Sequence, residues 1–253
     1  MGKLTGFYGK LPSHGDFISR NLPRTFIDPW DNWLQTVITA SQEQLGEQWL
    51  DFFLVSPVWR FILSDGNCGE SAWIGIIIPS VDRVGRYFPL TIASHINVSV
   101  KPIALIDECQ YWFKQVEEIA LDTLDDSYQL DDLEKKLKDI SEPITERLND
   151  NAMMNEIAKE NRFQGHFFMD PLNANPLSVF PSISHFFIEQ TFSTYSLWWS
   201  SGSEDIKPSF LLCEGLPKRD NFVSLLDGNW DRNSWHNVKP LFLVGDTPSL
   251  IGV

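Results

Sequence analysis

The segment Ala72–Ile78, AWIGIII, is the longest strongly apolar run in the chain. It is apolar at odd and even positions alike, and a strand with two apolar faces must be covered by other elements on both sides. Its length is far below the roughly 20 residues that a membrane-spanning helix requires. The segment therefore predicts the central strand of a sheet with both faces covered, and no membrane insertion is expected.

Two further strands are expected beside this one. Pro57–Leu63 alternates in part between apolar and polar residues, and Tyr87–Val98 alternates more regularly, which is the pattern of a strand with two different faces. Turn-forming residues separate the segments, at Asp65–Asn67 and in the Pro79–Gly85 loop. One face of the last strand is predicted to carry Leu90, Ile92, Ser94, Ile96 and Val98.

The residues before this sheet predict a strand followed by a helix. Leu4–Lys10 has strand character and ends in the loop Leu11–Asp16. Asp28 is expected to be the N-cap of a helix, with Pro29 at the first helical position. A backbone N–H at that position has no partner within the helix, so the N–H that proline lacks is not needed there. Residues at three- and four-residue spacing then predict one buried stripe, formed by Trp30, Leu34, Val37, Ile38, Ser41 and Leu45.

The second half of the chain predicts a helical block and then more strands. Pro102 is expected to open a long helix whose Lys114, Glu117 and Glu118 face water. Its buried side is predicted to be Ile106, Cys109, Phe113, Val116, Ala120 and Leu124. Further helices are expected at Leu130–Ile140, at Thr145–Glu160 behind Pro143, and near Asp220–Leu226; strands are expected at Phe186–Phe192, Tyr195–Ser200 and Ser209–Cys213.

This order of elements indicates an α/β fold in a single three-layer domain over residues 1–253. The sheet is expected to be mixed, largely antiparallel, with helices on both faces. Residues 103–161 are expected to form an acidic helical block, which could be an insertion into the domain.

The charge of the chain restricts its partners. The net charge is −14 and the isoelectric point is about 4.7, which argues against nucleic acids and anionic membrane surfaces, since both require clustered Lys and Arg. The stretch from Ala104 to Asn161 has 16 Asp and Glu against 6 Lys and Arg. Such a block is either a solvated helical surface or a docking surface for a basic partner.

Residue types that could catalyse a reaction are present, but not at the spacing that catalysis needs. Ser13, His14 and Asp16 lie within one tight loop and are not expected to reach triad geometry, so a capped turn is the favoured interpretation. The other histidines and the cysteines have no metal-ligand spacing: His95, His166, His185, His236, Cys68, Cys109 and Cys213. We therefore expect no enzyme activity, no cofactor and no metal. The N-terminus has no apolar signal segment, so a cytoplasmic location is expected.

The Pro79–Leu90 segment places two arginines and an aspartate in a loop between apolar strands. Buried arginine needs a carboxylate or carbonyl partner, which predicts a pair of Asp82 with Arg86, or of Asp16 with Arg83 or Arg86. Either these groups are a polar lock that fixes the loop, or the loop is a recognition element. This loop and Leu11–Asp16 are expected to lie together at one end of the sheet.

Four segments resemble the TagF (ImpM) family of type VI secretion system-associated proteins. They are Gly6–Phe17 with the following Arg20, Asp28–Leu34, Ser56–Phe61 and Pro79–Leu90. Arg20 and Arg60 are expected to join the loop network. The candidate partner-binding or motif residues are Pro12, Ser13, Gly15, Asp16, Arg20, Trp59, Arg60, Ser80, Asp82, Arg83, Gly85 and Arg86.

The resemblance implies a non-catalytic, cytoplasmic accessory protein that represses type VI secretion after translation. It also implies that the partner is a forkhead-associated scaffold protein, in a pathway controlled by a threonine kinase and a phosphatase. Two alternatives stay open. One is a structural or assembly component of the secretion machine, and the other is a hydrolase that uses His14 or His95.

Overall fold

The computed structural model describes residues 5–96, 103, 105–125, 127–140, 143, 179–233 and 235–238. Within these residues, a seven-stranded sheet runs in the order β2-β1-β5-β4-β3-β6-β7, and each pair of neighbouring strands is antiparallel. With the helices described below, this confirms the α/β fold class, but the described sheet is antiparallel throughout and not mixed as expected. The strands are β1 (Gly6–Gly9), β2 (Ile18–Arg20), β3 (Trp59–Leu63), β4 (Ala72–Ile78), β5 (Leu90–Ile96), β6 (Tyr195–Ser200) and β7 (Ser209–Glu214).

Strand β4 lies in the middle of the sheet, and all seven of its residues are buried. Trp73 and Ile77 contribute to the core on one face, whereas Ile74, Ile76 and Ile78 contribute to the core on the other. The run with two apolar faces thus divides the hydrophobic residues into two cores, as the sequence predicts.

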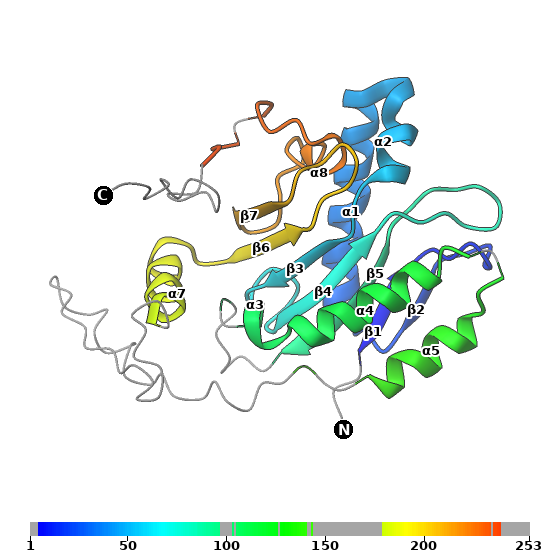
Figure 1. Ribbon diagram of the computed structural model, residues 1–253, viewed down its shortest axis with the longest axis horizontal. Helices are drawn as coiled ribbons and strands as arrows, with labels where there is room; N and C mark the ends of the chain where they lie inside the picture. Colours follow the sequence, from blue (N-terminus) through cyan, green and yellow to red (C-terminus); the bar gives the residue numbers. More distant parts are fainter. Residues whose placement is uncertain are drawn as a thin grey trace, which may run out of the picture.

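Helices cover both faces of the sheet (Figure 1). On one side lie α1 (Arg24–Leu45), η1 (Gly46–Gln48), α2 (Trp49–Val55) and α8 (Ser224–Asp227). On the other lie α3 (Leu105–Glu108), α4 (Gln110–Asp122) and α5 (Leu130–Asp139), while α7 (Phe180–Thr191) precedes β6. In the described part of the chain, no helix combines the length and the hydrophobicity that crossing a bilayer requires.

The core beneath α1 is built mainly from aromatic rings. Trp30 stacks on Phe26 and Trp198 at centroid distances of 5.5 and 6.1 Å, and it also contacts Phe61 at 4.8 Å. Its indole Nε1 donates to Thr91 Oγ1 at 2.9 Å. The tryptophan therefore joins α1 to three strands and satisfies its only polar atom inside the core.

Helix α1 begins earlier than expected. It begins at Arg24, with Pro23 as its N-cap, so Asp28 is not the N-cap and Pro29 lies inside the helix. Burial of Phe26 and Ile27 accounts for the extra turn, because both side chains pack into the core. The expected buried stripe is confirmed except at its end, where Leu45 is only partly buried.

Other elements also differ from the expectation. Phe186–Phe192 is not a strand: Phe180–Thr191 is helix α7, with a proline in its first turn. Leu124 is 46% exposed because α4 ends at Asp122 and the helical spacing stops there. The expected helix at Thr145–Glu160 lies outside the described residues, as do Asn97 and Val98 at the end of the predicted β5 segment.

Candidate functional site

Two loops meet at one end of the sheet. Residues 10–17 connect β1 to β2, and residues 79–89 connect β4 to β5. Because β1 and β5 are antiparallel neighbours, the end of one lies beside the start of the other. The Arg83 amide donates to the His14 carbonyl oxygen at 2.9 Å, and Ser80 Oγ donates to the Lys10 carbonyl oxygen at 2.8 Å. The expected meeting of the two loops is confirmed.

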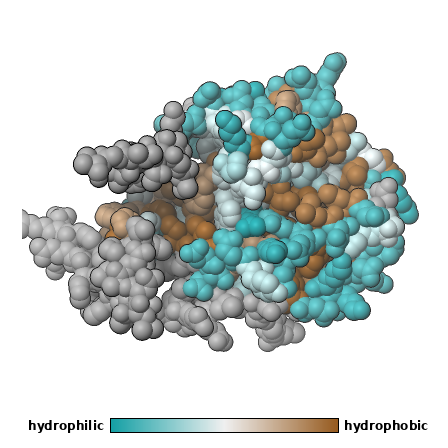
Figure 2. Space-filling view, viewed as in Figure 1, coloured by the Kyte–Doolittle hydropathy of each residue, from teal (hydrophilic) through white to brown (hydrophobic). Residues whose placement is uncertain are grey.

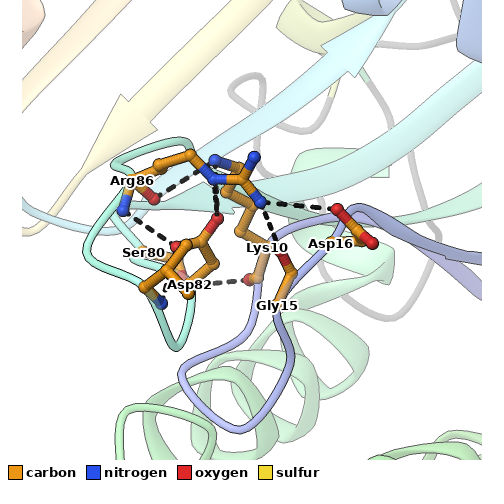
Figure 3. A network of polar contacts seen from close by, with 7 residues as sticks. Lys10, Gly15, Asp16, Ser80, Asp82 and Arg86 are labelled. Atoms are coloured by element: carbon orange, nitrogen blue, oxygen red, sulfur yellow. Dashed lines mark hydrogen bonds and ion pairs between the residues drawn. The ribbon is translucent and has the colours of Figure 1, made fainter.

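The Asp82 carboxylate is the centre of this contact, and Figure 3 shows the network around it. Its side chain is fully enclosed. Oδ1 accepts from the amides of Val84 at 3.0 Å and Arg86 at 2.9 Å. Oδ2 lies 2.6 Å from Arg86 Nε and 3.0 Å from Lys10 Nζ. Both oxygens are therefore bonded, which is the condition for keeping a buried carboxylate ionised.

These donors determine the charge state of Asp82. Burial by itself raises the pKa of the carboxyl group, but four donors oppose it. The Arg86 amide, the Lys10 ammonium, the Arg86 guanidinium and the Val84 amide together hold the pKa of Asp82 well below its usual range. The group is therefore an anion at every physiological pH.

Arg86 links this centre to the first loop. Its Nη2 donates to the Gly15 carbonyl oxygen and lies 3.4 Å from Asp16 Oδ1 (Figure 3). Two of the ion pairs that the sequence offered, Asp82 with Arg86 and Asp16 with Arg86, are thus both formed. We call Lys10, Gly15, Asp16, Asp82 and Arg86 the two-loop lock.

Lys10 is the member of the lock that sequence reasoning missed. Only 4% of it is exposed, and its Nζ also lies 5.1 Å from the centre of the Phe17 ring and 3.3 Å from the Arg86 carbonyl oxygen. The signal in the sequence was a lysine placed directly after a short apolar strand. A buried ammonium at that position requires a nearby anion, and Asp82 is that anion.

Arg20 and Arg60 do not belong to the lock, so that expectation is wrong. Arg20 Nε donates to Glu134 Oε1 of α5 at 2.7 Å. Arg60 makes two bonds of 2.6 Å to Glu117 of α4, and Glu117 therefore does not simply face water. Each arginine joins a helix to the sheet. Both arginines do pair with a carboxylate, as expected for partly buried arginine, but their spacing in the sequence could not show which carboxylate it is.

The remaining candidate residues have structural contacts. Trp59 is buried, and its Nε1 donates to the Leu225 carbonyl oxygen at 3.0 Å. Pro12 is buried within the first loop. Gly85 is exposed at the tip of the second loop with φ of +82°, a conformation in which a side chain would be strained.

Ser13 and His14 contact each other, but Ser13, His14 and Asp16 do not form a triad. Ser13 Oγ lies 3.1 Å from His14 Nδ1, so these neighbours do reach hydrogen-bond distance. Asp16, the third residue of the supposed triad, contacts Arg86 instead and leaves 96% of its side chain exposed. A second contact of this kind joins His95 Nε2 to Ser71 Oγ at 2.8 Å.

Other reactive groups in the described residues are poorly placed for chemistry. Cys68, Cys109 and Cys213 are buried, and burial raises the pKa of each thiol to about 12. A thiol with such a pKa is almost entirely protonated at neutral pH and is a weak nucleophile. Within the same residues, no group of three or more His, Cys, Asp or Glu side chains is arranged to hold a metal ion.

Comparisons with known proteins identify the family of this chain. The model of the TagF N-terminal domain, described as type VI secretion system-associated, matches residues 6–140. The chain is also similar to the crystal structure of PA0076 from Pseudomonas aeruginosa PAO1. The identity is 33% over 94% of this chain and 98% of that chain, and the TM-score is 0.73. A search of curated proteins gave no match. The matched range contains both loops of the lock, and the chain belongs to the TagF family of type VI secretion system-associated proteins.

Proposed function

We propose that this protein is a non-catalytic regulator that represses type VI secretion after translation by binding a forkhead-associated scaffold protein in the cytoplasm. The proposal starts from membership of the TagF family. The observation that carries it further is the two-loop lock, in which the enclosed Asp82 fixes two loops against each other. Loops held in one conformation lose little entropy when a partner binds, and this favours a recognition surface.

A binding role also suits the chemistry of the described residues. Asp16, the group nearest in sequence to the Ser13–His14 pair, is engaged with Arg86, and the cysteines are protonated inside the core. Repression by binding has one thermodynamic requirement: the regulator must prefer one state of the scaffold over the other. If the two scaffold states are equally populated, an affinity about 100-fold higher for one of them, near 2.7 kcal/mol, is enough to shift the scaffold almost completely into that state.

The test combines binding with secretion. The purified chain is titrated against the purified scaffold protein of the same secretion system, and secretion is compared in strains that lack or overproduce the chain. We expect saturable binding, more secretion without the chain and less secretion with an excess of it. Failure of the two purified proteins to bind contradicts the proposal.

Stoichiometry distinguishes the structural alternative. A machine component is recovered with the assembled apparatus at a fixed ratio, whereas a repressor is recovered with the unassembled scaffold. Recovery of the chain at a fixed ratio to assembled apparatus, with secretion lost when the chain is deleted, favours a structural component instead.

A further inference from the structure

Strand β7 has an open edge and an open apolar face. Among the described residues, β6 is hydrogen-bonded to one edge of β7 and no strand pairs with the other edge. On one face of β7, Leu211 and Cys213 are buried in the core beneath α1. On the opposite face, Phe210 and Leu212 are 54% and 40% exposed. Because an uncovered apolar edge strand pairs readily with other chains, proteins usually cover such an edge.

The open face of β7 continues the core that lies beneath α4. Phe210 stacks on Trp199 of β6 at a centroid distance of 6.5 Å, and Trp199 contacts Phe113 of α4 at 4.9 Å. Leu212 lies opposite Leu197 in the strand register, and Leu197 is fully buried. Figure 2 shows hydrophobic surface in the region where Figure 1 places β6 and β7. One more strand beside β7 would therefore complete this core.

The C-terminal residues of the chain contain a sequence that suits such a strand. Residues 241–244, LFLV, are the longest apolar run outside the described ranges. Leucine is neutral in strands, whereas Phe and Val favour them, and Pro240 and Gly245 bound the run as residues that commonly end a strand. Alternate residues of a strand share a face. In either register, the two residues that face the exposed side chains of β7 are therefore apolar.

The start of this C-terminal segment is held near β7. A Cβ at Gly228 would lie 3.0 Å from the Asp205 carbonyl oxygen, so the chain after α8 passes the connection that enters β7. Asn237 Nδ2 then donates to the Trp230 carbonyl oxygen at 3.3 Å. In Figure 1 the last described residues, drawn in red, lie on the side of the view where β7 is labelled. The run begins four residues after Asn237, a tether of up to about 14 Å.

We propose that residues 241–244 add to the open edge of β7 as a further strand and cover Phe210 and Leu212. The tether selects this occupant, since a short flexible linker gives an effective concentration in the millimolar range. Charge selects it too. Residues 239–253 contain one Lys and one Asp, so their side chains bring no net charge, whereas a second copy brings −14 to a molecule of the same sign. The inference does not depend on the proposed function. It closes the β7 edge to partners and to other copies.

The experiment measures hydrogen exchange of backbone amides in the full chain. Phe242→Pro and Leu243→Pro each remove one N–H from the run. Because successive N–H groups of a strand point to opposite sides, one of the two substitutions removes a donor to β7. The matched control is Ile251→Pro, which makes the same change at an apolar residue of the same segment outside the run. Unchanged exchange in β4 shows that a variant is folded, and light scattering gives its oligomeric state.

We expect at least one of the two proline substitutions in the run to speed exchange of amides in residues 209–214 at least tenfold, and Ile251→Pro to change it less than twofold. The effect should be reciprocal. Phe210→Asp places a charge where the run packs and should speed exchange in residues 241–244 at least tenfold. A variant that frees the edge should also self-associate, because the open strand is then available to another copy.

Three results would overturn the inference. If residues 209–214 exchange equally in the wild type and in both proline variants, the run does not pair with β7. Protection of β7 that increases with protein concentration identifies a second copy as the occupant. Protection that is lost in Phe167→Pro instead identifies the apolar run at residues 167–169. None of these measurements involves the scaffold protein, so the proposed function stands or falls separately.

Discussion

The Arg60–Glu117 pair allows the most quantitative test of how the helices are held on the sheet. The two side chains make bonds of 2.6 Å from Nε and Nη2 of Arg60 to the two carboxylate oxygens of Glu117, with side-chain exposures of 16% and 23%. Arg60 also receives support from Gln110 and from the ring of Phe113, 5.6 Å away. We predict that this pair stabilises the fold and does not contact the partner.

The magnitude follows from the geometry and the burial. Exposed ion pairs contribute about 0.2–1 kcal/mol, whereas hydrogen bonds to charged groups contribute about 1.5–3 kcal/mol. A mostly buried pair with two bonds should lie at the lower end of the second range, with a coupling free energy of about 1.5–2 kcal/mol. Arg60→Met also removes the contact with Phe113, so it should lower stability by about 2–3 kcal/mol, or the Tm by about 4–12 °C.

A double-mutant cycle measures the coupling. Urea unfolding is followed by tryptophan fluorescence for the wild type, Arg60→Met, Glu117→Gln and the double variant. The matched control is Arg20–Glu134, which has a single bond of 2.7 Å and exposures of 48% and 30%, so its coupling should stay below about 1 kcal/mol. Coupling below about 0.5 kcal/mol for Arg60–Glu117, or a loss of scaffold affinity in a folded Arg60→Met protein, refutes the reasoning.

Three further predictions concern the lock and the core. The pKa of Asp82 is lowered in the folded protein, so the ionised carboxylate stabilises the fold fully above its unfolded pKa of about 4, and this stabilisation is lost as the pH falls below that value. The difference in urea midpoint between wild type and Asp82→Asn should therefore be constant from pH 8 to 5 and shrink toward pH 3. A difference that stays constant down to pH 3 contradicts this prediction. Trp30→Phe leaves the Thr91 hydroxyl without its buried donor and should reduce the free energy of unfolding by about 2–3 kcal/mol. An unchanged free energy of unfolding contradicts this prediction. A Cβ at Gly75 would lie 2.3 Å from the Phe61 ring and 2.6 Å from a carbonyl oxygen, so Gly75→Ala should destabilise by at least about 2 kcal/mol in thermal unfolding; an unchanged Tm is the result that speaks against this packing.

Several local features of the fold could be predicted from the sequence because their causes are local. The run Ala72–Ile78 became the buried central strand with its predicted boundaries, since apolar residues on both faces have no other stable environment. The Asp82–Arg86 pair was also predictable, because its partners are four residues apart in one loop. Phe186–Phe192 was misread because a short apolar run has similar patterns in a helix and in a strand.

The sequence by itself determined the central strand, the two covered faces of the sheet and the polar loop beside it. Only the tertiary structure decided which groups meet across long distances in the chain. Lys10 pairs with Asp82, Arg60 with Glu117, and Arg20 with Glu134, and no local pattern records such pairings. The physical reason is that an ionised side chain needs a counter-charge near it in space, and the packing of strands and helices against one another, not their order in the chain, decides which one that is.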